Sequence, residues 1–305
     1  MKIIIEQVLI LFIFGAVGFM LAKLGIVKKE HSGVLSKLLV YVFLPANIVK
    51  TFAKNFTVGY LKANYLIVLV SLAIILLLCA VMHFTAKLFS RDGGERGIYE
   101  YSLIIPNFGY MGYAFAEALF GGSGLMDAMM LAIPMSVYTY TIGFCLLSGK
   151  RMNFKSLINP TMITLLVGML IGITGLGGIM HDFAYNLLDK ASVCMAPVSM
   201  LLAGIVISEF GIKRMLADAR VYIITALRLF IVPMAIGGIL TLLSVQSYII
   251  AAAVVLYAMP CGLNTIVFVR NAGGNCEIGA GLAFVSNIVA IVSIPVVLMI
   301  FGISL

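Results

Sequence analysis

Ten apolar stretches, each long enough to cross a membrane as a helix, constrain this chain more than any other feature of its sequence. A helix needs about 20 consecutive apolar residues to span the hydrocarbon core of a bilayer. The stretches cover residues 3–24, 33–53, 61–86, 96–119, 124–147, 156–175, 184–210, 219–243, 248–270 and 277–303. The sequence therefore predicts an all-α polytopic membrane protein with ten transmembrane helices, numbered here as spans 1 to 10.

The composition agrees with a chain whose solvent is lipid. Of the 305 residues, 63% are hydrophobic and 10% are charged, whereas soluble domains average about 25% charged residues. The net charge of +8 comes from basic residues in short loops and helix flanks. These residues form no basic stripe with interleaved aromatic side chains, so we do not expect a nucleic-acid partner.

The same sequence offers little support for catalysis or for a cofactor. It has no Walker A, HExxH or GxSxG pattern, so we expect neither ATP hydrolysis nor another enzymatic activity. Its five cysteines are scattered without a CxxC pair, which argues against a disulfide framework or a metal site. The loops are too short to hold a soluble domain.

The distribution of lysine and arginine predicts the orientation. With the N-terminus outside, 14 of the 20 basic residues lie on the cytoplasmic side, five lie outside, and Arg228 lies within span 8. Cytoplasmic loops carry the excess of lysine and arginine in membrane proteins. We therefore expect a multi-pass protein of the cell membrane with both termini outside.

Matched prolines divide the chain into two similar halves, residues 1–150 with spans 1–5 and residues 151–305 with spans 6–10. The pairs lie in spans 2 and 7, spans 4 and 9, and spans 5 and 10: Pro45 with Pro197, Pro106 with Pro260, and Pro134 with Pro295. Because five is odd, the second half enters the membrane from the opposite side. The pattern predicts a 5+5 inverted repeat, a plan found in many secondary transporters.

Spans 4 and 9 each combine proline, glycine and asparagine at mid-span. Span 4 contains Pro106, Asn107, Gly109 and Tyr110, and span 9 contains Pro260, Gly262, Asn264 and Thr265. Proline and glycine interrupt helices, and a broken helix at membrane depth is tolerated where it is buried in protein or lines a cavity. Half-helix N-termini attract anions. We predict a substrate site at these breaks, although asparagines also hold membrane helices together.

The order and spacing of several motifs resemble the auxin efflux carrier family, which includes plant auxin carriers and bacterial permeases similar to malate and malonate carriers. The resemblance covers essentially the whole chain. Its motifs are Phe43-Leu44-Pro45, Pro106-Asn107-Phe108-Gly109-Tyr110-Met111-Gly112, Ala118-Leu119-Phe120-Gly121, Asn159-Pro160, Pro197 with Leu201-Leu202-Ala203-Gly204, and Met259-Pro260 with Asn264. The long cytoplasmic loop of many plant carriers is absent, so the regulation associated with that loop is not transferred.

The resemblance implies that spans 4 and 9 cross at their prolines. It also implies a scaffold of spans 1, 2, 6 and 7, and a transport domain of spans 3–5 and 8–10 that moves in an elevator-like way. It places the substrate carboxylate at Asn107, with help from Asn47 and Thr51 in span 2 and from Tyr138, Ser136 or Thr141 in span 5. A homodimer is expected from the family alone.

Together these features predict a secondary transporter of small organic anions, such as malate, malonate or auxin-like acids, in a lipid bilayer. A proton, sodium or counter-substrate gradient would drive it, or the flux is passive. A sodium-coupled carrier similar to bile-acid symporters and a sensor with a transporter fold are the alternatives. The sequence leaves the roles of two charged residues open. Glu117 either faces the headgroups or takes part in proton coupling, and Arg228 either snorkels to the cytoplasmic face or attracts entering anions.

Overall fold

The structure is a computed structural model that describes residues 2–151 and 157–303. Helices account for its regular structure, and the described residues contain no strand. In the first half they are α1 (Lys2–Lys23), α2 (Ser32–Leu38), α3 (Leu44–Asn55), α4 (Val58–Asn64), α5 (Leu66–Phe89), α6 (Gly93–Ile104), α7 (Tyr113–Tyr138) and α8 (Phe144–Ser148). Three π-helical turns extend them: η2 (Leu39–Phe43), η3 (Phe108–Gly112) and η4 (Thr139–Gly143).

The second half continues in the same manner. Its α-helices are α9 (Pro160–Ile173), α10 (Asp182–Val193), α11 (Met195–Ser208), α12 (Ile212–Ala217), α13 (Ala219–Ala226), α14 (Val232–Leu242), α15 (Ser247–Tyr257), α16 (Asn264–Asn271) and α17 (Glu277–Ile300). The π-helical turn η7 (Leu227–Ile231) joins α13 to α14. Short 3₁₀ turns, η1 (Lys29–His31) and η6 (Leu176–Ile179), lie in loops.

Seven helical runs among the described residues, one of them interrupted at Ile105–Asn107, are long and apolar enough to cross a membrane. They are Ile4–Lys23, Ser32–Asn55, Leu66–Phe89, Gly93–Ser148, Asp182–Ser208, Ala219–Leu242 and Glu277–Ile300. These runs confirm the prediction of an all-helical, multi-pass membrane protein. Seven is fewer than the ten predicted spans, and three particular elements explain the difference.

The 56-residue run Gly93–Ser148 contains both predicted spans 4 and 5. It turns sharply at Gly121, whose φ of 68° favours glycine. The other two predicted spans, 6 and 9, correspond to the shorter apolar helices Pro160–Ile173 and Ser247–Tyr257. Helix α9 begins where the Asn159 side chain accepts a hydrogen bond from Met162 N and Pro160 occupies the first turn. The predicted start of span 6, residue 156, lies outside the described residues.

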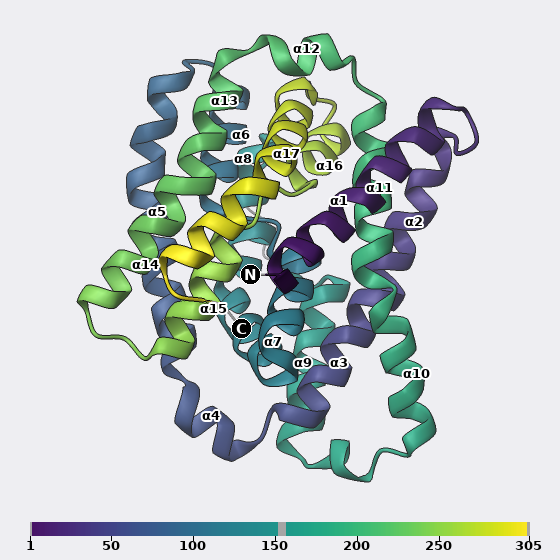
Figure 1. The fold of residues 1–305 in the computed structure, drawn as a ribbon, viewed down its shortest axis with the longest axis vertical. Helices are drawn as coiled ribbons and strands as arrows, with labels where there is room; N and C mark the ends of the chain where they lie inside the picture. The colour runs from purple at the N-terminus through teal and green to yellow at the C-terminus, as the bar shows by residue number, and fades with distance from the viewer. Residues whose placement is uncertain (1, 152–156, 304–305) are drawn as a thin grey trace.

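Helix packing separates the molecule into two groups. In the first group, α1 packs on α11, α11 on α2, and α3 on both α9 and α10. In the second group, α5 packs on α6 and α7, α15 on α7 and α14, and α17 on α12 and α13. Figure 1 shows α2, α3, α10 and α11 on one side and α5, α13 and α14 on the other, while α4 and α12 lie at opposite ends. Contacts of α17 with α1, and of α7 with α1 and α3, connect the groups.

Glycines allow the closest approach within the first group. A Cβ atom added at Gly204 of α11 would lie 1.9 Å from the carbonyl oxygen of Gly15 in α1. One added at Gly18 would lie 2.2 Å from the carbonyl oxygen of Leu201. Small residues permit such backbone contact between membrane helices, where dispersion forces drive association. The α1–α11 pair is therefore closely packed.

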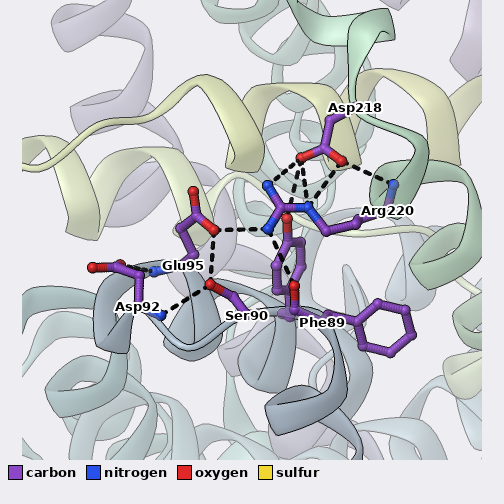
Figure 2. A network of polar contacts seen from close by, with 7 residues as sticks. Phe89, Ser90, Asp92, Glu95, Asp218 and Arg220 are labelled. Atoms are coloured by element: carbon purple, nitrogen blue, oxygen red, sulfur yellow. Dashed lines mark hydrogen bonds and ion pairs between the residues drawn. The ribbon is translucent and has the colours of Figure 1, made fainter.

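A polar network ties the second group together at the end that carries α12 (Figure 2). Arg220 of α13 donates hydrogen bonds to Asp218, to Glu95 Oε2 at 2.9 Å, and to the Phe89 carbonyl oxygen at 3.1 Å. Its guanidinium also lies 5.5 Å from the centroid of the Tyr99 ring. These contacts join α13 to the α5–α6 connection, which belongs to the other half of the sequence.

Candidate functional site

The first interruption that forms the site lies between α6 and α7. Helix α6 ends at Ile104, and Ile105 has extended backbone angles of φ −107° and ψ 117°. Asn107 (φ −76°, ψ 59°) is also non-helical, and the π-turn η3 follows it. Pro106 has no N–H to donate to the preceding turn and restricts the residue before it to extended conformations. The break therefore falls where the proline predicted it.

The second interruption lies between α15 and α16. Helix α15 ends at Tyr257, and α16 starts only at Asn264. The intervening segment contains Pro260, and the N–H of Cys261 donates to Ser286 Oγ of α17 at 3.0 Å. This side-chain acceptor replaces a helical carbonyl, so the unwound backbone stays satisfied inside the protein.

The two interruptions meet each other. The N–H of Asn107 donates to the carbonyl oxygen of Pro260 at 2.8 Å. A Cβ atom added at Gly262 would lie 3.6 Å from both Cα and Cβ of Asn107. A Cβ atom added at Gly112 would lie 2.7 Å from Leu256 Cδ2, so η3 and α15 also pack closely. Proline and glycine thus bring two distant segments of backbone into direct contact.

A small cavity of about 60 Å³ lies beside this junction. All of its lining residues are uncharged at neutral pH, and many carry hydroxyl or amide groups. They are Leu44, Pro106, Asn107, Phe108, Gly109, Tyr110, Tyr113, Ser136, Thr139, Tyr140, Thr161, Gly262, Leu263 and Asn264. Seven of the predicted site residues line this cavity: Pro106, Asn107, Gly109, Tyr110, Ser136, Gly262 and Asn264.

Four of the lining side chains carry a polar group that makes no hydrogen bond within the described residues: the Asn107 carboxamide, the Tyr110 and Tyr113 hydroxyls, and Ser136 Oγ. Ser136 Oγ is buried, in a residue that is only 1% exposed. In contrast, Asn264 Nδ2 donates to Tyr101 OH at 2.7 Å, and that hydroxyl donates to Thr139 Oγ1 at 3.5 Å. Asn264 is therefore held in place, whereas the Asn107 and Ser136 side chains make no hydrogen bond within the described residues.

The remaining predicted residues do not line the cavity. Thr265 Oγ1 donates to the Gly262 carbonyl oxygen at 3.2 Å, and Pro260 contributes its carbonyl to the junction. In α3, Thr51 Oγ1 donates to Asn47 Oδ1 at 3.3 Å, and Asn47 Nδ2 lies 3.8 Å from Met195 Sδ of α11. The two α3 residues thus pack inside the first helix group.

Of the three residues predicted in span 5, Ser136 lines the cavity, whereas Tyr138 and Thr141 do not. Ser136, Thr139 and Tyr140 share one face because they are three and four residues apart. Tyr138 lies on another face, is 3% exposed, and its hydroxyl has no partner in the described chain. Thr161, at the start of α9, was missed because nothing in its own stretch of sequence indicates that α9 reaches this cavity.

The charged residues left open by the sequence occupy defined positions. Lys50 Nζ of α3 donates to Glu117 Oε1 of α7 at 2.9 Å and to Asp189 Oδ1 of α10 at 3.2 Å. Glu117 therefore lies in an ion pair between the two helix groups. Arg228 does not snorkel to the cytoplasmic face: it is 0% exposed and donates to the Met259 carbonyl oxygen at 3.4 Å. Its side chain points into the bundle because packing of η7 against α17 and α6 buries that face.

Comparison with known proteins places the sequence in a family. The model of the membrane transport protein family matches residues 3–156 and again residues 145–298, which together cover almost the whole chain. The chain belongs to this family. It is the auxin efflux carrier family that the motifs around Pro106 and Pro260 resemble, so that prediction is confirmed.

Two archaeal members of this family align with the chain. A protein of Methanothermobacter thermautotrophicus named an uncharacterized transporter is 22% identical over 295 residues, covering 95% of this chain and 96% of the relative. The uncharacterized transporter MJ1031 of Methanocaldococcus jannaschii is 24% identical over 222 residues, covering 68% of this chain and 70% of the relative. Membership in the auxin efflux carrier family establishes a membrane transporter.

Proposed function

We propose that this transporter carries small organic anions and binds them at the junction of the two broken helices. The observation that carries the proposal is the cavity where the Asn107 N–H meets the Pro260 carbonyl. The half-buried Asn107 carboxamide and the buried Ser136 Oγ line this space without a hydrogen-bond partner in the described residues. Burying a hydroxyl such as that of Ser136 without a partner costs free energy, and a bound ligand offsets that cost.

The backbone around the cavity favours an anion over a cation. Phe108, Gly109 and Tyr110 line the cavity from the first residues of η3, and Asn264 lines it from the first residue of α16. The first N–H groups of a helix have no acceptor within it and carry partial positive charge. A carboxylate accepts hydrogen bonds from such groups and from neutral amides and hydroxyls. A carboxylate is therefore the ligand chemistry we propose.

The size of the cavity limits the substrate. Pockets for drug-sized ligands measure about 300–1,000 Å³, whereas this cavity measures about 60 Å³. It accommodates a carboxylate group with few further atoms. A dicarboxylate such as malate, or an aromatic acid, requires the helices around the cavity to separate. We therefore place short-chain carboxylates first among the substrates.

The architecture we propose is a 5+5 inverted repeat that works as an elevator. The two successive family matches, over residues 3–156 and 145–298, support two repeats of similar length. The first helix group corresponds to a scaffold of spans 1, 2, 6 and 7, and the second to a transport domain of spans 3–5 and 8–10. Their separate packing supports movement of one against the other.

Ion pairs between the groups limit that movement. Lys50 and Asp189 of the first group hold Glu117 of the second. Glu209, directly after α11, lies 3.0 Å from the Arg270 guanidinium of α16. An elevator movement breaks at least one of these contacts in each direction. We further propose a cell-membrane location with both termini outside, and a homodimer, which the family assignment supports.

Transport by reconstituted protein tests the function. Purified protein in liposomes is supplied with radiolabelled lactate, malonate, malate or an indole acid, each with and without proton and sodium gradients. Protein-free liposomes and liposomes with an Asn107→Asp variant, which adds a negative charge in the cavity, serve as controls. We expect uptake of at least one short carboxylate that the variant loses. Absence of uptake for every acid under every gradient would refute the proposal.

A further inference from the structure

Arg228 is an unusual residue for its place in the membrane. It is the tenth residue of the helical run Ala219–Leu242, so it lies about 14 Å along the helix from the start of that run. This depth is near the middle of a hydrocarbon core about 30 Å thick. The side chain is 0% exposed, and the ion pairs of the described residues do not include it. A buried cation without a carboxylate partner is costly, and such residues are rare in membrane spans.

The guanidinium is only partly satisfied. Its Nη2 donates to the Met259 carbonyl oxygen at 3.4 Å, and its Cζ lies 5.7 Å from the centroid of the Tyr257 ring. Neither Nε nor Nη1 has a hydrogen-bond partner within the described chain. Three of the five N–H donors belong to these two nitrogens. The fold therefore maintains an excess of positive charge and of free donors at this position.

That position is the C-terminal end of a half-helix beside the proposed anion site. Helix α15 ends at Tyr257, and Met259 directly precedes Pro260. The Pro260 carbonyl in turn accepts the Asn107 N–H. Arg228 and Asn107 thus bind two successive carbonyls of the same unwound segment. The C-terminal end of a helix carries partial negative charge, which a cation stabilises.

In ion-coupled transporters with broken helices, unwound carbonyls and half-helix C-terminal ends coordinate the coupling cation. We infer that Arg228 serves as a built-in cation at this end, so that the site binds a monocarboxylate without sodium. The inference rests on the proposed function and specifies its substrate charge and coupling. One fixed positive charge balances one carboxylate, whereas a dicarboxylate leaves a net negative charge in the bilayer interior.

The experiment measures binding and uptake of the monocarboxylate that wild-type protein transports best, in sodium chloride and in choline chloride. The variants are Arg228→Gln, which removes the charge, and Arg228→Lys, which keeps it. Arg214→Gln is the matched control, because Arg214 is an exposed arginine of α12 paired with Glu277 outside the cavity. Thermal melting of each variant in detergent checks that it is folded.

We expect wild-type affinity to be equal in the two salts within a factor of two. In Arg228→Gln the dissociation constant rises about tenfold or more, as expected when a charge that attracts the ligand is lost. Arg228→Lys retains affinity within about threefold, and Arg214→Gln matches wild type. An Arg228→Gln protein with wild-type affinity would overturn the inference. Saturable stimulation of wild-type uptake by sodium would also overturn the inference. This result needs no variant, and it would not refute the proposed function. Failure of wild-type protein to take up any carboxylate refutes the proposed function itself.

Discussion

Asn107→Ala isolates the hydrogen bond on which the proposed anion site depends most. The wild-type carboxamide has no partner among the described residues, so its removal breaks no contact with another side chain. The backbone N–H of residue 107 keeps its bond to Pro260 in the variant. A hydrogen bond to a charged group contributes about 1.5–3 kcal/mol. The dissociation constant for a carboxylate should therefore rise about 10- to 150-fold.

The stability of the variant should change little, since surface-like substitutions without lost contacts stay within about 0.5 kcal/mol. Binding is measured by scintillation proximity on purified protein, and stability by thermal melting of the same sample. Asn287→Ala is the matched control, because the Asn287 side chain donates to the Ala283 carbonyl of its own helix and does not line the cavity. A dissociation constant within twofold of wild type would refute the role of Asn107, as would a large fall in melting temperature that accounts for the weaker binding.

Three further predictions concern binding, packing and pH. Ser136→Ala should weaken carboxylate binding about tenfold without lowering the melting temperature, because the hydroxyl is buried and unpartnered; unchanged binding would exclude it from the site. Gly204→Ala should destabilise the protein by about 1–3 kcal/mol through a clash with α1, whereas Gly238→Ala, with open space around it, should not; equal melting temperatures would contradict this packing. Hydrogen bonds from Arg220 lower the pKa of Asp218. The ionised Asp218 carboxylate therefore contributes to the free energy of unfolding above about pH 4, and this contribution is lost as pH falls toward the lowered pKa. Asp218→Asn should therefore cost about 1 kcal/mol at pH 7, and thermal melts should show that difference shrinking in acid; a difference that grows in acid would reverse the assignment.

Local sequence was sufficient to locate the helix breaks. Pro106 and Pro260 interrupt helices because of their own chemistry, so the breaks at Ile105–Asn107 and at 258–263 follow from the residues themselves. The membrane class follows from the length and composition of the apolar stretches in the same way. The family assignment depended on the order of short motifs, and the match to the family model confirms it.

Features that depend on which way a side chain points from its helix were harder to predict. Hydropathy places Arg228 at a depth in the membrane but does not indicate which way its side chain points, and it is buried instead of snorkelling. In span 5, polar residues follow one another so closely that only the helical face separates Ser136 and Thr139 from Tyr138. Thr161 reaches the cavity through the packing of α9, which no local signal encodes.

The position of a bound anion tests the central claim most directly. A brominated short carboxylate, 3-bromopropionate, is bound to the purified protein, and the bromine is located by anomalous diffraction from crystals of the complex. The account predicts a peak beside the cavity formed by Asn107, Ser136 and Gly262, and its loss in Asn107→Asp crystals. A peak only at the separate cavity lined by Ser123, Asp127 and Tyr248, or none at a saturating concentration, would contradict it.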